Sequence, residues 1–286
     1  MPPVTRPSDP RERPIAVFDS GVGGLTVLHE LLVQLPNEDF VYLGDTARFP
    51  YGRRTPAELE RFAMEIAEEL LARGAKLLVV ACNTATAAAL PALRRRMLET
   101  TLGVDVLGVV RPEAQQAVVA TRNGRIGLLA TPATVDSGAY AQAVTAADPH
   151  VDLVAVPCPD LAPLIQDGAG FDERLVDAVR ASCAPLLQAR VDTVILGCTH
   201  YPLVQPMLQR TLGRAVRIVT SGAALARQVE HALSSRELAS PRTAEGEYRF
   251  LCTGDPEAFR AQGTRFLQLP LGPVEHLSLP QREAAA

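Results

Sequence analysis

The sequence predicts an α/β fold with mainly parallel sheets, and two observations support this prediction. Segments with the apolar pattern of strands alternate with segments of helical periodicity along most of the chain. Most of the strand-like segments are continuously apolar, which is typical of strands that helices cover on both faces. We therefore expect a three-layer architecture with helices on both sides of each sheet.

The expected elements follow one another in a regular order. One helix is indicated by Pro56 in its first turn, by glutamates close behind it, and by Gly74 as its stop signal. Up to residue 82 we expect strands at residues 14–21, 39–46 and 76–82 and helices at residues 25–35 and 56–74. Further strands are expected at residues 104–110, 125–130, 152–156, 193–197, 216–220 and 248–251.

A weak internal repeat suggests two similar units. The segment IAVFDSG near the start resembles IGLLATPATV near the middle, and each precedes, at a similar distance, a strand that ends in cysteine. Two similar α/β units with a site between them would explain the pattern. The general likeness of α/β strands would also explain it, so the pattern alone leaves both explanations open.

Composition narrows the class of protein. The chain has 286 residues, 47% of them hydrophobic and 21% charged, with a net charge of −4, so it gives no reason to expect a nucleic-acid surface. No apolar run is long enough to span a membrane, and the opening MPPVTRPSDPRERP lacks the apolar centre of a secretory signal. We expect residues 1–13 to be a disordered tail. The five cysteines lack CxxC spacing, which predicts free thiols in the cytoplasm.

Two of these cysteines stand where chemistry is expected. Cys82 and Cys198 end apolar strands, and α/β sheets bind ligands beyond the carboxyl ends of their strands. Each precedes an expected helix start, which favours a thiolate, and His200 follows closely as a proton carrier. The alternative is that such a cysteine is only a small core residue. That explanation is favoured for the remaining cysteines, Cys158, Cys183 and Cys252.

Other polar residues gather at the ends of the first strands. They are carboxylate, hydroxyl and amide groups, which suit a small zwitterionic ligand better than a phosphate. The GVGG segment fits neither GxGxxG nor a P-loop, so a tight turn is favoured over an anion cradle. The residues of this group are Asp19, Ser20, Asp45, Tyr51 and Gly52.

Several reactions use thiols, and the spacing decides among them. A disulfide oxidoreductase would normally show CxxC. A zinc site could take Cys82, Cys198 and His200, but this is not a usual ligand spacing. A Cys–His hydrolase needs one thiol only. Two thiols that face each other across a carbon stereocentre could invert it, each acting as acid or base.

Four motifs, FDSGVGGLTVL, YLGDTARFPYG, ACNTATA and LGCTHYPL, resemble those of the glutamate racemase family, within the aspartate/glutamate racemase superfamily. The resemblance covers about residues 15–277. It implies an isomerase that interconverts L- and D-glutamate without a cofactor and supplies D-glutamate for peptidoglycan synthesis and cell wall biogenesis. The alternatives are a racemase of another small acid such as aspartate, or a regulatory, gyrase-binding protein that retains the fold.

The resemblance also implies roles for individual residues. Cys82 and Cys198 would be the acid/base thiols, with Asp19 supporting Cys82 and His200 supporting Cys198. The substrate site would be lined by Asp19, Ser20, Tyr51, Gly52, Asn83, Thr84, Thr199 and His200, with Asp45, Gln166, Thr131 and Thr134 in supporting positions.

The implied organisation is two similar α/β domains with the site between them. The first would comprise residues 14–107 and 221–286, and the second residues 108–220. Glutamate is the expected partner, with no metal, no membrane and no direct nucleic-acid contact, and with a homodimer as a possible assembly. The only lysine, Lys76, opens a strand at the end away from the site, so a pyridoxal Schiff base is not expected.

The sequence departs from the family pattern at two places. Gln166 stands where the family usually has a glutamate, with Asp167 next to it, and we expect the amide rather than Asp167 to serve there. Arg111 replaces a residue that is often acidic or apolar, and the sequence does not explain it.

Overall fold

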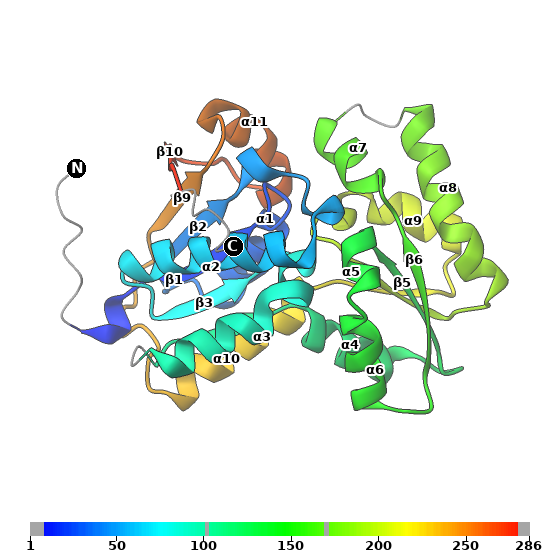
Figure 1. The fold of residues 1–286 in the computed structure, drawn as a ribbon, viewed down its shortest axis with the longest axis horizontal. Helices are drawn as coiled ribbons and strands as arrows, with labels where there is room; N and C mark the ends of the chain where they lie inside the picture. Colours follow the sequence, from blue (N-terminus) through cyan, green and yellow to red (C-terminus); the bar gives the residue numbers. More distant parts are fainter. Residues whose placement is uncertain (1–8, 101–102, 169–171, 280–286) are drawn as a thin grey trace.

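The computed structural model describes residues 9–100, 103–168 and 172–279. Two α/β lobes lie side by side, each built on one sheet (Figure 1). Every strand pairing in both sheets is parallel. The strands are β1 (Ile15–Asp19), β2 (Phe40–Gly44), β3 (Leu77–Val80), β4 (Asp105–Gly108), β5 (Arg125–Ala130), β6 (Asp152–Pro157), β7 (Thr193–Gly197), β8 (Arg217–Val219), β9 (Tyr248–Cys252) and β10 (Val274–His276).

The two sheets share one strand order. The first sheet runs β10-β9-β2-β1-β3-β4 and the second runs β6-β5-β7-β8. In the first lobe β2 lies on one side of β1, with β3 and then β4 on the other side. In the second lobe β6 lies on one side of β5, with β7 and then β8 on the other side. This shared order supports the two-unit explanation of the internal repeat, with β9 and β10 as additions to the first sheet. In such a sheet the ligand crevice lies between the first and third strands.

Helices cover both faces of both sheets, as the continuous apolar runs predict. In the first lobe, alternate residues of β1 pack towards α1, α10 and α11 on one face and towards α2 and α3 on the other. In the second lobe, α4 and α6 cover one face and α7, α8 and α9 the other. The helices are α1 (Leu25–Gln34), α2 (Pro56–Ala72), α3 (Asn83–Glu99), α4 (Val110–Ala120), α5 (Pro132–Asp136), α6 (Ala139–Ala147), α7 (Leu161–Asp167), α8 (Glu173–Gln188), α9 (Gln205–Leu212), α10 (Gly222–Ser235) and α11 (Pro256–Leu267).

The apolar core is continuous between the lobes. One cluster of buried side chains contains residues of β1 and α1 from the first lobe and residues of β7, α8 and α9 from the second. Burial of this shared surface stabilises the packing of one lobe against the other.

Several expectations differ from the structure in detail. Of the expected tail, residues 1–8 lie outside the described residues, whereas Pro10–Glu12 form a 3-10 helix. That segment is anchored by Lys76, whose ammonium donates to the carbonyl of Arg11 at 2.6 Å and to Glu38 at 2.5 Å. Lys76 directly precedes β3, as expected. Strand β10 was not expected, because three residues are too few to show a pattern.

The domain boundaries stay a prediction. The first sheet takes its strands from residues 15–108 and 248–276, and the second from residues 125–219. Sheet membership does not fix the residues at which one lobe ends and the other begins, since α4 and α10, which cover different sheets, also pack against each other.

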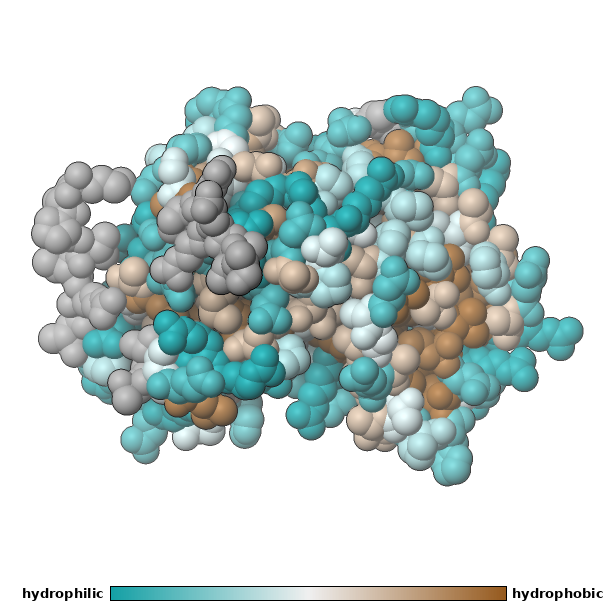
Figure 2. Space-filling view, viewed as in Figure 1, coloured by the Kyte–Doolittle hydropathy of each residue, from teal (hydrophilic) through white to brown (hydrophobic). Residues whose placement is uncertain are grey.

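The surface of the face in Figure 2 is mostly polar, with apolar side chains gathered over the second lobe, where β5 and β6 lie. Strand β6 is the edge of its sheet, and its side chains are only partly covered. None of the helices in the described residues combines the length and the apolar character that crossing a membrane requires.

Candidate active site

The carboxyl ends of the two sheets face a shared pocket between the lobes. Cys82, just beyond β3, and Cys198, just beyond β7, both line it. Each thiol therefore follows the third strand of its lobe, next to the crevice position of the fold. The pocket is lined by Ser20, Phe49, Pro50, Tyr51, Gly52, Arg53, Cys82, Asn83, Thr84, Thr131, Pro159, Ala162, Pro163, Cys198, Thr199 and His200.

Cys82 is the N-cap of α3. Its sulfur accepts a hydrogen bond from the backbone N–H of Ala85 at 3.4 Å. This bond and those from Ser20 lower the pKa of the thiol, but burial and the nearby carboxylate of Asp19 raise it more, to about 12. The helix start favours the thiolate of Cys82 as expected, but desolvation outweighs the helix terminus, so the net shift of the pKa is upward.

Cys198 has different surroundings. No α-helix begins directly after it; a 3-10 helix, η4 (Tyr201–Val204), comes first, and α9 starts only at Gln205. Its sulfur lies 3.9 Å from Nδ1 of His200. Burial raises the pKa of this thiol well above its ordinary value, and the charges of Cys82 and Asp19 add to the effect.

Asp19 lies behind the pocket wall, fully buried at the end of β1. One carboxylate oxygen accepts from the backbone N–H of Gly21 at 3.0 Å, and the other from the hydroxyl of Thr199 at 3.3 Å. Burial raises the pKa of Asp19 to about 6. Because its charge raises the pKa of both thiols, Asp19 acts on Cys198 as well as on Cys82.

His200 is held in one tautomer by Gln166. Nε2 of His200 lies 2.9 Å from the amide oxygen Oε1 of Gln166. Since that oxygen can only accept, Nε2 carries the hydrogen and Nδ1 presents a lone pair towards Cys198. Burial lowers the pKa of His200 to about 3, so the ring is neutral. Asp167 is exposed, so the amide and not the neighbouring carboxylate contacts the histidine.

A triangle of hydroxyls joins the two lobes beside the thiols. Oγ1 of Thr84, in the first turn of α3, lies 2.9 Å from that of Thr131 and 3.0 Å from that of Thr134. Thr131 caps α5 in the second lobe. Thr134 contacts the hydroxyls of both Thr84 and Thr131 but does not itself line the pocket.

The loop after β2 brings Tyr51 and Gly52 to the pocket. The hydroxyl of Tyr51 donates to Asp45, which also accepts from Arg48 at 2.6 Å and from Thr253 at 2.7 Å. Asp45 therefore holds the loop from behind and does not line the pocket. Burial raises the pKa of Tyr51 well above its ordinary value, so its hydroxyl stays protonated.

Glycines let the lobes approach closely, a role the sequence did not reveal. A Cβ atom at Gly23 would lie 2.3 Å from Nδ1 of His200 and 2.4 Å from Oγ1 of Thr199. At Gly52 it would lie 2.7 Å from Cβ of Thr131. Gly23 belongs to the GVGG segment, which therefore serves lobe contact.

Glu113 of α4 was also missed by sequence reasoning. It is fully buried beside Asn83, whose amide nitrogen donates to it at 3.0 Å. Arg111, two residues before it, is exposed and lines an outer groove between α4 and α10.

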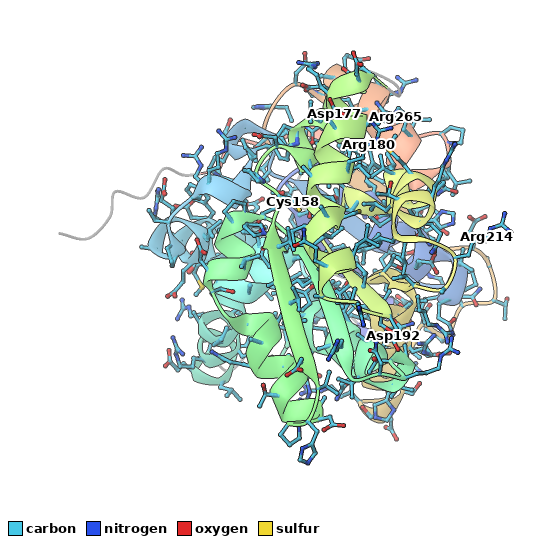
Figure 3. All side chains as sticks on the ribbon, turned by 90° about the vertical axis from the view of Figure 1, so that its right-hand side faces the viewer. Cys158, Asp177, Arg180, Asp192, Arg214 and Arg265 are labelled. Atoms are coloured by element: carbon cyan, nitrogen blue, oxygen red, sulfur yellow. The ribbon has the colours of Figure 1, made fainter. Side chains whose placement is uncertain are left out.

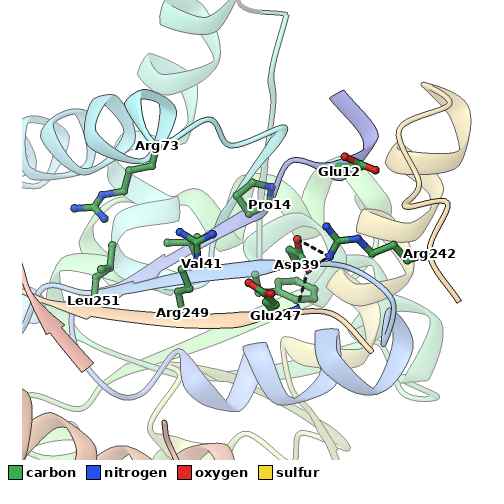
Figure 4. A pocket seen from close by; sticks show the side chains of 10 residues that line it. Glu12, Pro14, Asp39, Val41, Arg73, Arg242, Glu247, Arg249 and Leu251 are labelled. Carbon is green, nitrogen blue, oxygen red and sulfur yellow. Dashed lines mark hydrogen bonds and ion pairs between the residues drawn. The ribbon is translucent and has the colours of Figure 1, made fainter. Parts of the chain in front are cut away.

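The other cysteines are buried and free but lie outside the pocket lining. Figure 3 shows Cys158 at the carboxyl end of β6, while Asp192 lies at the opposite end of that lobe. A second hollow lies at the amino ends of β2 and β9 (Figure 4); there Arg242 pairs with Asp39 at 2.7 Å. Within the described ranges, no group of three or more His, Cys, Asp or Glu side chains is placed to hold a metal ion.

A sequence model of the family described as Asp/Glu/Hydantoin racemase matches residues 25–229. Glutamate racemase of Geobacter metallireducens is 43% identical over 265 residues, which cover 93% of this chain and 96% of the relative. The crystal structure of a glutamate racemase isoform from Bacillus anthracis matches with a TM-score of 0.89 at 34% identity, over 95% of this chain and 100% of that chain. The structure from Francisella tularensis in complex with D-glutamate matches with a TM-score of 0.87 at 30% identity, over 95% and 100%.

Two parallel α/β lobes and a family model that covers most of the chain define an α/β amino-acid racemase, an isomerase. Within that class, the chain belongs to the glutamate racemase family.

Proposed function

We propose that this protein racemises glutamate with Cys82 and Cys198 as two bases: one cysteine removes the Cα proton, and the other gives a proton to the opposite face of Cα. The observation that carries the proposal is the meeting of two thiols, one from each lobe, in one pocket. One relative with the same fold was solved with D-glutamate bound. The thiolate of one cysteine takes the proton from Cα and becomes a thiol. The thiol of the other cysteine gives its proton to the opposite face of the carbanion and becomes a thiolate.

Burial is the main obstacle to this chemistry. Because it raises the pKa of both cysteines, both hold their protons before substrate binds. The ammonium group of glutamate favours the thiolate by its charge. When Cys82 is the base, Asp19, ionised above a pH of about 6, receives the proton of Cys82, and Cys198 stays protonated. When Cys198 is the base, Nδ1 of His200 receives its proton, and Cys82 stays protonated.

The carbanion also needs stabilisation, because the Cα proton is very weakly acidic. The first turn of α3 offers backbone N–H groups, and Thr84 offers a hydroxyl at the pocket wall, whereas the hydroxyl of Thr199 donates to Asp19. These donors suit the α-carboxylate, on which negative charge develops in the transition state. Ser20, Tyr51 and Gly52 line the pocket too and suit the other end of the substrate.

The proposal is tested by circular dichroism of the purified protein with D-glutamate and no added cofactor. The expected result is loss of the signal to zero, the racemic mixture, with aspartate converted far more slowly. Full inhibition by a chelator that zinc reverses, or preference for aspartate, would contradict the proposal. Cys158→Ser is the matched control, because this thiol is buried but does not line the pocket.

The cellular role follows from the same proposal. D-glutamate made in the cytoplasm would supply peptidoglycan synthesis. The assembly of the chain as a homodimer stays a prediction, which light scattering of the purified protein would test.

A further inference from the structure

Glu113 is a buried carboxyl group that the proposed mechanism does not use. Its three hydrogen-bond partners come from three other helices or their caps: Asn83 at the start of α3, Tyr140 on α6, and Ser221 at the N-cap of α10. The amide of Asn83 donates to Oε2 at 3.0 Å, Ser221 donates to Oε1 at 2.6 Å, and the hydroxyl of Tyr140 donates to Oε2. All three partners are uncharged.

A carboxyl group in this position needs an explanation, because burying one without a cation is costly. Burial raises the pKa of Glu113 to about 8, against the pull of its three hydrogen bonds. An apolar residue would fill the same space without this cost.

The partner with a functional position is Asn83, which lines the pocket. Its amide nitrogen donates to Oε2 of Glu113 at 3.0 Å and to the hydroxyl oxygen of Tyr140 at 2.7 Å, and because these two acceptors are hydrogen-bonded to each other, they share one N–H of the amide. Its amide oxygen is buried and has no hydrogen-bond partner among the described residues. Because the amide group is planar, fixing the nitrogen also fixes the direction of the oxygen.

We infer that Glu113 is a positioning residue, which holds the amide of Asn83 so that its oxygen accepts a hydrogen bond from the ammonium group of the substrate. The inference rests on the proposed function. An amide oxygen can only accept, so it cannot bind the substrate carboxylates. With Glu113 and Tyr140 in place, a rotation of the amide by half a turn would bring its oxygen against an acceptor.

The acceptor, and not the charge, performs this task. Glu113→Met removes the acceptor at similar volume, so the amide of Asn83 is free to turn. Glu113→Gln keeps an oxygen for Asn83 and Tyr140 and turns its own NH₂ group to the hydroxyl of Ser221, which can accept. Glu113→Gln should therefore keep the Asn83 amide in place, whereas Glu113→Met should not. Ser221→Ala is the matched control, because it removes a hydrogen bond to the other oxygen, Oε1, and does not touch Asn83.

The test measures KM and kcat for glutamate in these variants. Glu113→Met should raise KM about tenfold with kcat changed less than about threefold, because a contact to the ammonium is made in both ground and transition states. Glu113→Gln and Ser221→Ala should keep KM within about twofold. If Glu113→Met does not fold, Tyr140→Phe removes the second partner of the Asn83 amide and should raise KM in the same way.

A double-mutant cycle separates positioning from a general structural role. In an Asn83→Ala background, Glu113→Met should have no further effect on KM, since the residue through which it acts is gone. An undiminished effect there, or an unchanged KM in the single Glu113→Met variant, would overturn the inference. If the unaltered chain did not racemise glutamate, the proposed function would fail and this inference with it, so the two failures are distinguishable.

Discussion

Cys82 and Cys198 occupy equivalent places in two lobes of the same strand order, yet their surroundings differ. Cys82 caps a helix of 17 residues and accepts from a backbone N–H group. Cys198 is followed by a 3-10 helix and lies 3.9 Å from an imidazole nitrogen. The fold therefore places the two thiols symmetrically, while local chemistry makes them unequal.

This difference shows which residues of the site act on both thiols and which act on only one of them. Asp19 acts on both thiols, because its charge raises the pKa of each. Of the two thiols, His200 contacts Cys198 only, and the first turn of α3 contacts Cys82 only. Substitution of a residue that acts on both thiols should slow both directions of the reaction. Substitution of a residue that acts on one thiol should slow the two directions unequally.

Removal of either thiol should have the largest effect. Cys82→Ser and Cys198→Ser should each lower kcat by about a thousandfold or more, because a hydroxyl is a far weaker acid and its conjugate base is scarcely formed at neutral pH. Circular dichroism with each enantiomer measures the rates. Cys183→Ser should keep activity even if it costs stability; a comparable loss there would remove the distinction between the pocket thiols and the core thiols.

His200→Asn should have the next largest effect, and an unequal one. The variant removes the proton acceptor beside Cys198, so kcat should fall by about a hundredfold in one direction and less in the other. The two values of kcat are measured from D- and from L-glutamate. An equal fall of the two kcat values would show that His200 does not act on Cys198 alone. The ratio of kcat/KM values cannot serve here, because the equilibrium constant fixes it.

Gly23→Ala should act on the contact between the lobes. Its methyl group would overlap His200 and Thr199, so the lobes must move apart by a fraction of an ångström or more. Misplacement on this scale should lower kcat/KM about tenfold or more. Gly272→Ala is the control, since a Cβ atom there meets nothing within 4 Å. Equal activity of the two variants would contradict the role given to Gly23.

Gln166→Glu should have the smallest effect on the maximal rate. A carboxylate 2.9 Å from Nε2 favours the protonated ring and so raises the pKa of His200 from about 3. Protonation removes the lone pair that faces Cys198, so activity should be lost at a higher pH than in the unaltered chain. In the direction in which Cys198 is the base, the acid limb of the pH–rate profile should move up by about one unit.

Asp167→Asn is the control for that prediction, because this exposed side chain should leave the profile unchanged. A hundredfold loss of kcat in Asp167→Asn, with the fold intact, would show that Asp167 and not Gln166 supports the histidine.

Much of the fold could be predicted from local patterns. The strands at residues 125–130 and 193–197 were placed at their observed bounds, because continuous apolar runs flanked by turns mark parallel strands. Strand β10 was missed because it has only three residues. The helix expected directly after Cys198 is instead a 3-10 helix, a difference that Pro202 alone does not indicate.

The site was only partly predictable for a physical reason. Motif residues such as Cys82 and Thr199 were found because their chemistry is visible in the sequence. Glu113 was not, since its burial arises from helices distant in the chain. The net rise of the thiol pKa could not be predicted either, because a helix start is a local feature whereas desolvation depends on the whole pocket.

Proton exchange with solvent tests the central claim, one thiol for each face of Cα, most directly. D-glutamate is incubated with the protein in deuterated water, and the label in both enantiomers is measured by mass spectrometry at low conversion. Two bases that each serve one face predict deuterium at Cα of the L-glutamate formed and almost none in the recovered D-glutamate. Equal early labelling of both enantiomers would show that a single base serves both faces and would contradict the account.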